Sequence, residues 1–216
     1  MKRNLKTRKN WLNNLKLIRT GVFLFCVSIG INSYCQTPKD YKKHLDNPAP
    51  IESLEEANSN PDSVISLRLQ KQKLTKFPKE IRQFKNLEVL DLKKNEIDSV
   101  PAWIGELQNL RVLVLSKNNL TVLPDEICLL KNLIVFQAGE NQLTHFPEGV
   151  NNLVNLEFLD LWSNEIEYLP PPIQDLKNLK LLDMRITLTN REIQEAIREM
   201  LPDTKIYFSA PCKCGD

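Results

Sequence analysis

Apolar residues recur along residues 64–186 with a period of 23 and without any insertion or deletion. The second and third units read LEVLDLKKNEIDSVPAWIGELQN and LRVLVLSKNNLTVLPDEICLLKN. Their shared pattern is L-x-x-L-x-L-x-x-N-x-[LI]-x-x-[LVF]-P-x-x-[IV]-x-x-L-x-N. The units begin at Val64, Leu87, Leu110, Leu133, Leu156 and Leu179. A fixed period of this length indicates a solenoid in which each repeat covers its neighbour.

Each part of the unit predicts a local structure. The L-x-x-L-x-L stretch alternates like a short strand, so the leucines point into the solenoid and the residues between them point outward. A short amide after the strand can bond the backbone groups of the turn, which predicts a structural ladder at Asn95, Asn118, Asn141 and Asn164. The proline that follows fits the start of a helical turn, at Pro78, Pro101, Pro124, Pro147 and Pro170.

This pattern resembles that of leucine-rich repeat proteins, in the 23-residue subclass with a Leu-Pro step that occurs in bacterial and Ras-pathway-scaffold proteins. The resemblance runs from about Val64 to Met184. It implies an α/β fold, a leucine-rich repeat solenoid with a curved parallel sheet on the concave face and short helical or 3-10 turns on the convex face. It also implies helical caps at both ends and a non-enzymatic protein–protein interaction module.

Both flanks of the repeats carry helix signals. Ser53 and Glu56 have capping-box spacing, as do Thr189 and Glu192. After the second pair, an apolar stripe predicts a helix that closes the solenoid, with Ile193, Ala196, Ile197, Met200 and Leu201 on one face. The expected organisation is a signal peptide (1–35), a linker (36–50), an N-terminal cap (51–63), the repeats (64–186), a cap helix and edge strand (187–208) and a Cys-x-Cys tail (209–216).

The first 35 residues have the features of a secretory signal peptide. They carry seven cations and no acid before the apolar run of residues 21–31, which is shorter than the about 20 residues that a membrane-spanning helix needs. Ser33 and Cys35 suit cleavage before Gln36, which predicts a secreted, periplasmic or surface protein. A lipid anchor at Cys35 is the alternative, although Tyr34 stands where lipoprotein signals have a small residue. If residues 1–35 are not a signal, a cytoplasmic location follows.

Removal of this segment changes the electrostatics of the chain. The 216 residues have a net charge of +2, but without residues 1–35 there remain 22 cations against 27 acids, a net charge of −5. Nucleic-acid binding requires clustered cations, so this class of partner is disfavoured. We also expect no membrane span in the exported chain, which we predict to be a monomer.

The sequence offers few residues for catalysis. His44 and His145 lie outside any catalytic or metal motif, and the prediction is no enzyme activity, no metal site and no cofactor. Cys128 is expected to be a lone thiol. Cys212 and Cys214 allow a redox pair, half of a metal site, a strained bridge or a flexible tail, and they leave a redox or metal accessory protein as an alternative function.

The outward strand positions form three columns along the predicted concave face. The first column is Ser66, Val89, Val112, Val135, Phe158 and Leu181; the second is Arg68, Asp91, Val114, Gln137, Asp160 and Asp183; the third is Gln70, Lys93, Ser116, Gly139, Trp162 and Arg185. In the middle and last repeats these outward positions are largely apolar or aromatic, which predicts an exposed apolar patch. Such patches mark contact sites. The expected partner-binding residues are Val112, Val114, Val135, Phe158, Asp160, Trp162, Leu181, Asp183 and Arg185.

Two details of this face remain open at the level of sequence. Asp160 and Asp183 are adjacent, so they can share a ligand cation or meet Arg185, and Gly139 beside Trp162 predicts a shallow pocket for a partner side chain. The partner itself is an unknown protein ligand. The alternative to an exported binding module is an intracellular or host-delivered signalling scaffold like the Ras-pathway proteins.

Overall fold

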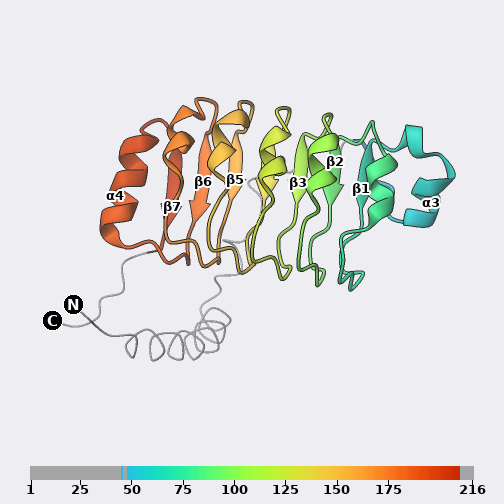
Figure 1. Cartoon of the computed structure of the whole chain (residues 1–216), viewed down its shortest axis with the longest axis horizontal. Coiled ribbons are helices and arrows are strands. Elements are labelled where there is room, and N and C mark those ends of the chain that lie inside the picture. The colour runs from blue at the N-terminus through green and yellow to red at the C-terminus, as the bar shows by residue number, and fades with distance from the viewer. Residues whose placement is uncertain (1–44, 46–47, 210–216) are drawn as a thin grey trace. The chain divides into compact units, whose positions relative to one another are not determined.

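Each of the first five 23-residue units forms one short strand followed by one 3-10 helix in the computed structural model, which describes residue 45 and residues 48–209. In the sixth unit an α-helix follows the strand. Within these residues seven parallel strands form one sheet in chain order (Figure 1). The strands are β1 (Ser66–Arg68), β2 (Val89–Asp91), β3 (Val112–Val114), β4 (Val135–Gln137), β5 (Phe158–Asp160), β6 (Leu181–Met184) and β7 (Lys205–Phe208).

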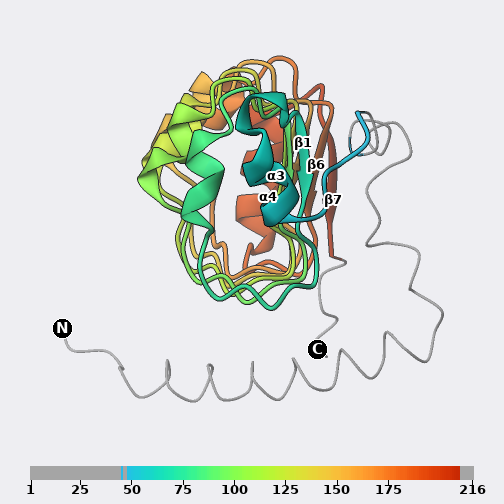
Figure 2. The ribbon, with the colours of Figure 1, turned by 90° about the vertical axis from the view of Figure 1, so that its right-hand side faces the viewer.

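The 3-10 helices lie on the side of the core opposite the sheet (Figure 2). They are η2 (Pro61–Ser63), η3 (Lys79–Gln83), η4 (Ala102–Glu106), η5 (Asp125–Leu129), η6 (Glu148–Asn152) and η7 (Pro171–Asp175). From η3 to η7, a repeat proline stands one position before the first helical residue. In η3, η4, η5 and η7 the carbonyl of this proline accepts the N–H three residues later. The fixed φ of proline therefore sets the direction in which each unit enters the convex side.

The register repeats the sequence period. Leu67 pairs with Leu90, Leu90 with Leu113, and the same step of 23 residues continues as far as Leu182. The last step is 24 residues, from Leu182 to Ile206, because α4 is inserted before β7. Equal units therefore stack without slippage, and each inward side chain meets its counterpart in the neighbouring repeat.

The core consists of these inward positions. Leu90, Leu92, Leu113 and Leu115 are fully buried, as the alternation predicts. In the fourth unit Phe136 and Ala138 replace two leucines and are also fully buried, and Phe136 packs against Phe146 with ring centroids 6.0 Å apart. One larger and one smaller side chain thus fill about the same volume as the two leucines of the other units.

A helix lies at each end of the array (Figure 1). α3 (Leu54–Ser59) begins after Ser53, whose side chain accepts the N–H groups of Glu55 and Glu56. α4 (Arg191–Met200) begins after Asn190, whose side-chain oxygen accepts the N–H of Ile193 at 2.9 Å. The capping-box spacing predicts Thr189 as the capping residue, and this prediction is wrong. The side chain of the next residue, Asn190, makes the bond instead, and asparagine is at least as good a cap as threonine.

The apolar stripe of α4 is narrower than its sequence pattern. Ile197 and Leu201 are buried, and Ile193 and Met200 are partly buried against the core. Ala196 is exposed, which corrects its expected place in the stripe.

The asparagines after the strands form the expected structural ladder. Asn118 is buried, and its Nδ2 donates to the carbonyls of Leu115 at 2.8 Å and Leu92 at 3.1 Å. Its Oδ1 accepts the N–H of Ile97 at 3.1 Å. Asn95, Asn141 and Asn164 make the corresponding bonds one repeat apart. Each side chain thus joins two neighbouring repeats and satisfies backbone groups that are shielded from water.

A second asparagine ladder stands at the ends of the first five units. Its side-chain amides donate to a carbonyl 24 residues earlier and are exposed, at Asn86, Asn109, Asn132, Asn155 and Asn178. The two ladders differ in burial and in the number of bonds, so their contributions to stability should differ as well.

Replacing Asn118 by alanine should lower the free energy of unfolding by about 3 kcal/mol, because each buried backbone group left without a partner costs about 1–3 kcal/mol. Asn132→Ala, at the exposed ladder, should cost less than about 1 kcal/mol. Urea denaturation followed by circular dichroism measures both. Equal losses in the two variants would contradict the role of the buried ladder.

Candidate functional site

The first two columns of the concave face are covered in the middle of the sheet. Val112, Val114, Val135 and Phe158 are at most 3% exposed, so the expected exposed apolar patch is wrong at these positions. They form an apolar cluster with Val89, separate from the solenoid core, and the side chain of Leu45 packs against this cluster. We call these five strand residues the concave cluster.

Four of the other expected partner-binding residues are partly exposed. They are Asp160, Trp162, Leu181 and Arg185, whereas Asp183 is buried at 7% exposure. The strands bring them to the C-terminal end of the face, where β5, β6 and β7 lie side by side. We call Trp162, Leu181, Arg185 and Tyr207 the open rim. Tyr207 joins this group because it is paired with Asp183 in the register of β6 and β7 and is 37% exposed.

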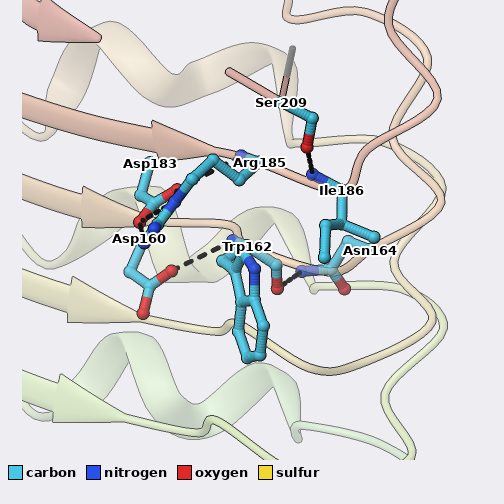
Figure 3. A network of polar contacts seen from close by, with 7 residues as sticks. All are labelled: Asp160, Trp162, Asn164, Asp183, Arg185, Ile186 and Ser209. Atoms are coloured by element: carbon cyan, nitrogen blue, oxygen red, sulfur yellow. Dashed lines mark hydrogen bonds and ion pairs between the residues drawn. The ribbon is translucent and has the colours of Figure 1, made fainter. Parts of the chain in front are cut away.

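A polar network orders the open rim (Figure 3). The Nε of Arg185 donates to both carboxylate oxygens of Asp183, at 2.9 and 3.2 Å, and its Nη2 pairs with the same carboxylate. The guanidinium also lies 5.5 Å from the ring centroid of Tyr207, within the range of a cation–π contact. The indole of Trp162 extends away from this pair (Figure 3). The arrangement thus presents two aromatic side chains on either side of a fixed cation.

The carboxylates of the second column hold the backbone of the third column. Asp160 accepts the N–H of Trp162 at 3.0 Å, and Asp183 accepts that of Arg185 at 3.1 Å. Asp91 does the same for Lys93 at 3.0 Å. Of the two alternatives left by the sequence, the structure therefore shows Asp183 bonded to Arg185.

Gly139 does not leave the expected pocket beside Trp162. A Cβ at Gly139 would lie 2.9 Å from the Oδ1 of Asp160 and 3.1 Å from the carbonyl oxygen of Trp162. The carboxylate of Asp160 thus occupies the space over the glycine, and glycine is needed here to admit it.

Burial perturbs two of these acids. Burial, together with the neighbouring carboxylate of Asp183, raises the pKa of Asp160 to about 7. The hydrogen bond from Trp162 and the cations Arg185 and Lys93 act in the opposite direction. Burial also raises the pKa of Asp91, against the hydrogen bonds that it accepts. An acid with a pKa near neutral therefore lies beside the open rim, next to Asp183 and Trp162.

The remaining chemical candidates do not meet at the open rim. His145 is exposed and lies 3.0 Å from the hydroxyl of Thr144. Cys128 lies in η5 as a free thiol and is buried in the core, and burial raises the pKa of its thiol to about 12. Among residue 45 and residues 48–209, no group of three or more His, Cys, Asp or Glu side chains is placed to hold a metal ion. His44, Cys212 and Cys214 lie outside the described residues.

Sequence reasoning missed two contributors to this face. Tyr207 could have been predicted from the sequence, because extending the outward columns into the expected edge strand places this residue next to Asp183. Leu45 had no such signal, because it lies outside the repeats and its contact with the concave cluster follows no period.

A family model described as a leucine-rich repeat region matches residues 96–204, half of the chain. The chain belongs to the leucine-rich repeat family. Its repeats, register and ladder agree with this assignment along the whole sheet. No sequence of a curated protein matches the chain.

Solved leucine-rich repeat structures extend the comparison. A leucine-rich repeat protein of Leptospira interrogans is 38% identical, with a TM-score of 0.62 over 63% of this chain and 35% of that one. The plant peptide hormone receptor RGFR1, solved in complex with RGF2, is 31% identical, with a TM-score of 0.59 over 68% of this chain and 24% of that one. An internalin of Listeria monocytogenes is 18% identical, with a TM-score of 0.61 over 74% and 47%, and shows the fold alone.

The chain thus spans about a third of the Leptospira protein and about a quarter of the plant receptor. Within the described residues, the leucine-rich repeat chain contains no helix of the length and apolar character that crossing a membrane requires.

The raised pKa of Asp160 predicts how stability changes with pH. Because the pKa in the folded chain, about 7, exceeds the ordinary value of 3.8, the folded state binds this proton more tightly than the unfolded state. Asp160 therefore makes the free energy of unfolding fall as the pH rises from about 4 to about 7. Asp160→Asn should stabilise the chain by about 4 kcal/mol at pH 8 and change little at pH 4, since the shift is about three pKa units and one unit corresponds to about 1.4 kcal/mol.

Urea denaturation at both pH values checks this prediction. Asp62→Asn, at an exposed carboxylate, is the control and should leave the pH profile unchanged. A gain from Asp160→Asn that is equal at pH 4 and pH 8 would show that ionisation of this acid is not responsible.

Proposed function

We propose that this leucine-rich repeat chain is an exported, non-enzymatic module that binds a protein partner through its concave face. The observation that carries this proposal is the open rim, where two aromatic side chains flank an arginine that Asp183 already holds in place. Aromatic residues and arginine are the side chains that most often anchor protein interfaces. An ordered arginine also loses less conformational freedom when a partner arrives.

The polar surroundings of the open rim fit this function. Trp162 and Arg185 have backbone N–H groups bonded to acids of the second column, so the backbone that carries both side chains is fixed before binding. A preorganised surface gives specificity because the partner must match a geometry that already exists. Leu181, partly exposed beside them, adds apolar area to the same patch.

The comparisons give general support for a binding role. The RGFR1 receptor was solved in complex with RGF2, and another match is the BIR3–SERK2 complex of Arabidopsis thaliana, at 27% identity and a TM-score of 0.50 over 59% of this chain and 68% of that one. In the present chain the kind of partner follows from the open rim: a protein segment that offers apolar groups to Trp162 and Tyr207 and an acceptor to Arg185.

Export is the second part of the proposal. It is supported by the seven cations and the short apolar run of residues 1–35, and by Ser33 and Cys35, which suit cleavage before Gln36. The proposed location is outside the cell or in its envelope.

Partner capture tests the binding site. We expect the double variant Trp162→Ala/Tyr207→Ala to bind its partner at least tenfold more weakly, because interface anchors of this kind often contribute about 2 kcal/mol or more. The immobilised full chain is exposed to envelope and extracellular fractions of the producing cell, and bound proteins are quantified by mass spectrometry.

The control for this experiment is Tyr168→Ala, which removes an aromatic side chain of 49% exposure outside the open rim. Its capture should equal that of the parent, and both variants should keep the parent's thermal transition. A partner that the double variant captures as strongly as the parent does would reject the open rim as its binding site.

Mass determination of the chain recovered from its native cell tests export. The expected amino terminus is Gln36. A chain that still begins at Met1, or one that carries a lipid on Cys35, would contradict the proposed cleavage.

A further inference from the structure

The concave cluster is buried more deeply than its place on the sheet explains. Val89, Val112, Val114, Val135 and Phe158 are between 0 and 4% exposed, although they point away from the solenoid core. Neighbouring strands, about 4.8 Å apart, cover only the flanks of such side chains, so their outer atoms stay open unless something lies over the sheet.

The cover is local rather than general. Leu181 stands in the same column as Phe158, one strand further, and is partly exposed. Trp162 and Lys93, in the third column, are partly exposed as well. The buried apolar side chains of this face therefore run from Val89 in β2 to Phe158 in β5, and the exposure begins at Leu181 and Trp162 of the open rim.

Three partly buried side chains pack against the concave cluster, Leu45, Ile134 and Leu181, and of these only Leu45 comes from outside the repeats. Its side chain packs against the concave cluster, and its carbonyl oxygen accepts a hydrogen bond from the Nη2 of Arg68 at 3.1 Å. Arg68 belongs to β1 and also lies 3.6 Å from the carboxylate of Glu52. One arginine thus holds the chain on both sides of Ile51.

Ile51 fixes the point where the chain reaches the sheet. Its N–H donates to the carbonyl of Ser66 and its carbonyl accepts the N–H of Arg68, both at 2.8 Å, so it continues the sheet beyond β1. Residues 48–51 lie on the side of the sheet that faces away from the 3-10 helices (Figure 2). Ile51 lies six positions after Leu45, and an extended chain of six residues reaches at most about 20 Å, or about four strand spacings.

We propose that Leu45, tethered through residues 48–51, is a built-in ligand of the concave cluster. An external partner that reaches this cluster has to displace Leu45, and the peptide chemistry that fits is an extended segment with an aliphatic side chain and a backbone carbonyl for Arg68. The displacement rests on the proposed binding function of the concave face, whereas the occupancy by Leu45 does not.

The separation of the two apolar clusters makes such displacement feasible. Among the described residues, the concave cluster shares no member with the buried core beneath the sheet. Lifting Leu45 therefore uncovers the concave side without removing any core contact. Ile51 behaves differently, because it packs against the core and its backbone bonds keep the tether in place.

Thiol labelling of the full chain tests the occupancy. Cys26, Cys35, Cys212 and Cys214 are changed to serine, while Cys128 stays as a buried reporter of the core. Val112→Cys then places a thiol in the concave cluster, and Val122→Cys places one at a position of 48% exposure. Mass spectrometry follows the reaction of each chain with a maleimide.

We expect Val112→Cys to react at least tenfold more slowly than Val122→Cys. Adding Leu45→Asp should raise the rate at Val112→Cys at least tenfold and leave Val122→Cys unchanged, because a carboxylate does not stay in an apolar site. Cys128 should remain unlabelled throughout, which shows that the solenoid stays folded. Equal rates at the two positions in the parent chain, or no response to Leu45→Asp, would overturn the proposal.

Partner capture then separates the two proposals. The chain with Leu45→Asp should capture its partner at least tenfold more strongly if Leu45 competes for the concave face. Faster labelling with unchanged capture overturns the displacement, while the occupancy by Leu45 stands. Loss of capture in Trp162→Ala/Tyr207→Ala bears only on the open rim, because neither residue belongs to the concave cluster.

Discussion

Every other feature of this chain depends on the constant step of 23 residues between neighbouring strands. The step is maintained by buried amides, because each ladder asparagine binds a carbonyl of its own unit and a carbonyl of the unit before. A unit one residue longer or shorter would leave these backbone groups without partners and would turn every inward side chain of its strand outward. The ladder thus couples the hydrogen bonding of the turns to the packing of the core.

A constant step also decides how the concave face is built. Outward residues of successive units lie side by side, so side chains at equivalent positions form continuous columns. In a sheet with a variable step the same side chains would not be neighbours. The column of valines contributes most of the concave cluster, and the carboxylate of Asp183 comes close enough to that of Asp160 to raise the pKa of Asp160. The cations Lys93 and Arg185 of the third column lower the pKa of Asp160 and so partly offset the negative charge of the second column. The electrostatics of the face is therefore a consequence of the repeat.

The sequence predicts what is periodic and misses what is not. The strands, the proline turns and the ladder at Asn95 to Asn164 follow from the period, and the structure confirms them. The cap of α4 is Asn190, one residue after the predicted Thr189, because the choice between two adjacent capping side chains depends on local geometry. Leu45, which packs against the cluster containing Val112 and Val135, lies outside the repeats, and no pattern within the units contains that contact.

In a solenoid whose sheet is covered by turns on one side only, apolar side chains on the other side have to be shielded from water in another way. Against the core, the inner leucines are covered by the convex turns of the same units, and this cover is permanent. The concave cluster has no such layer within the repeats, so its cover comes from a segment held by Arg68 and by two backbone bonds of Ile51. A cover attached at one edge by so few bonds excludes water from the valines, yet it is far easier to remove than a packed helix. The same face can therefore stay protected in the free chain and still offer apolar area when a competing peptide arrives.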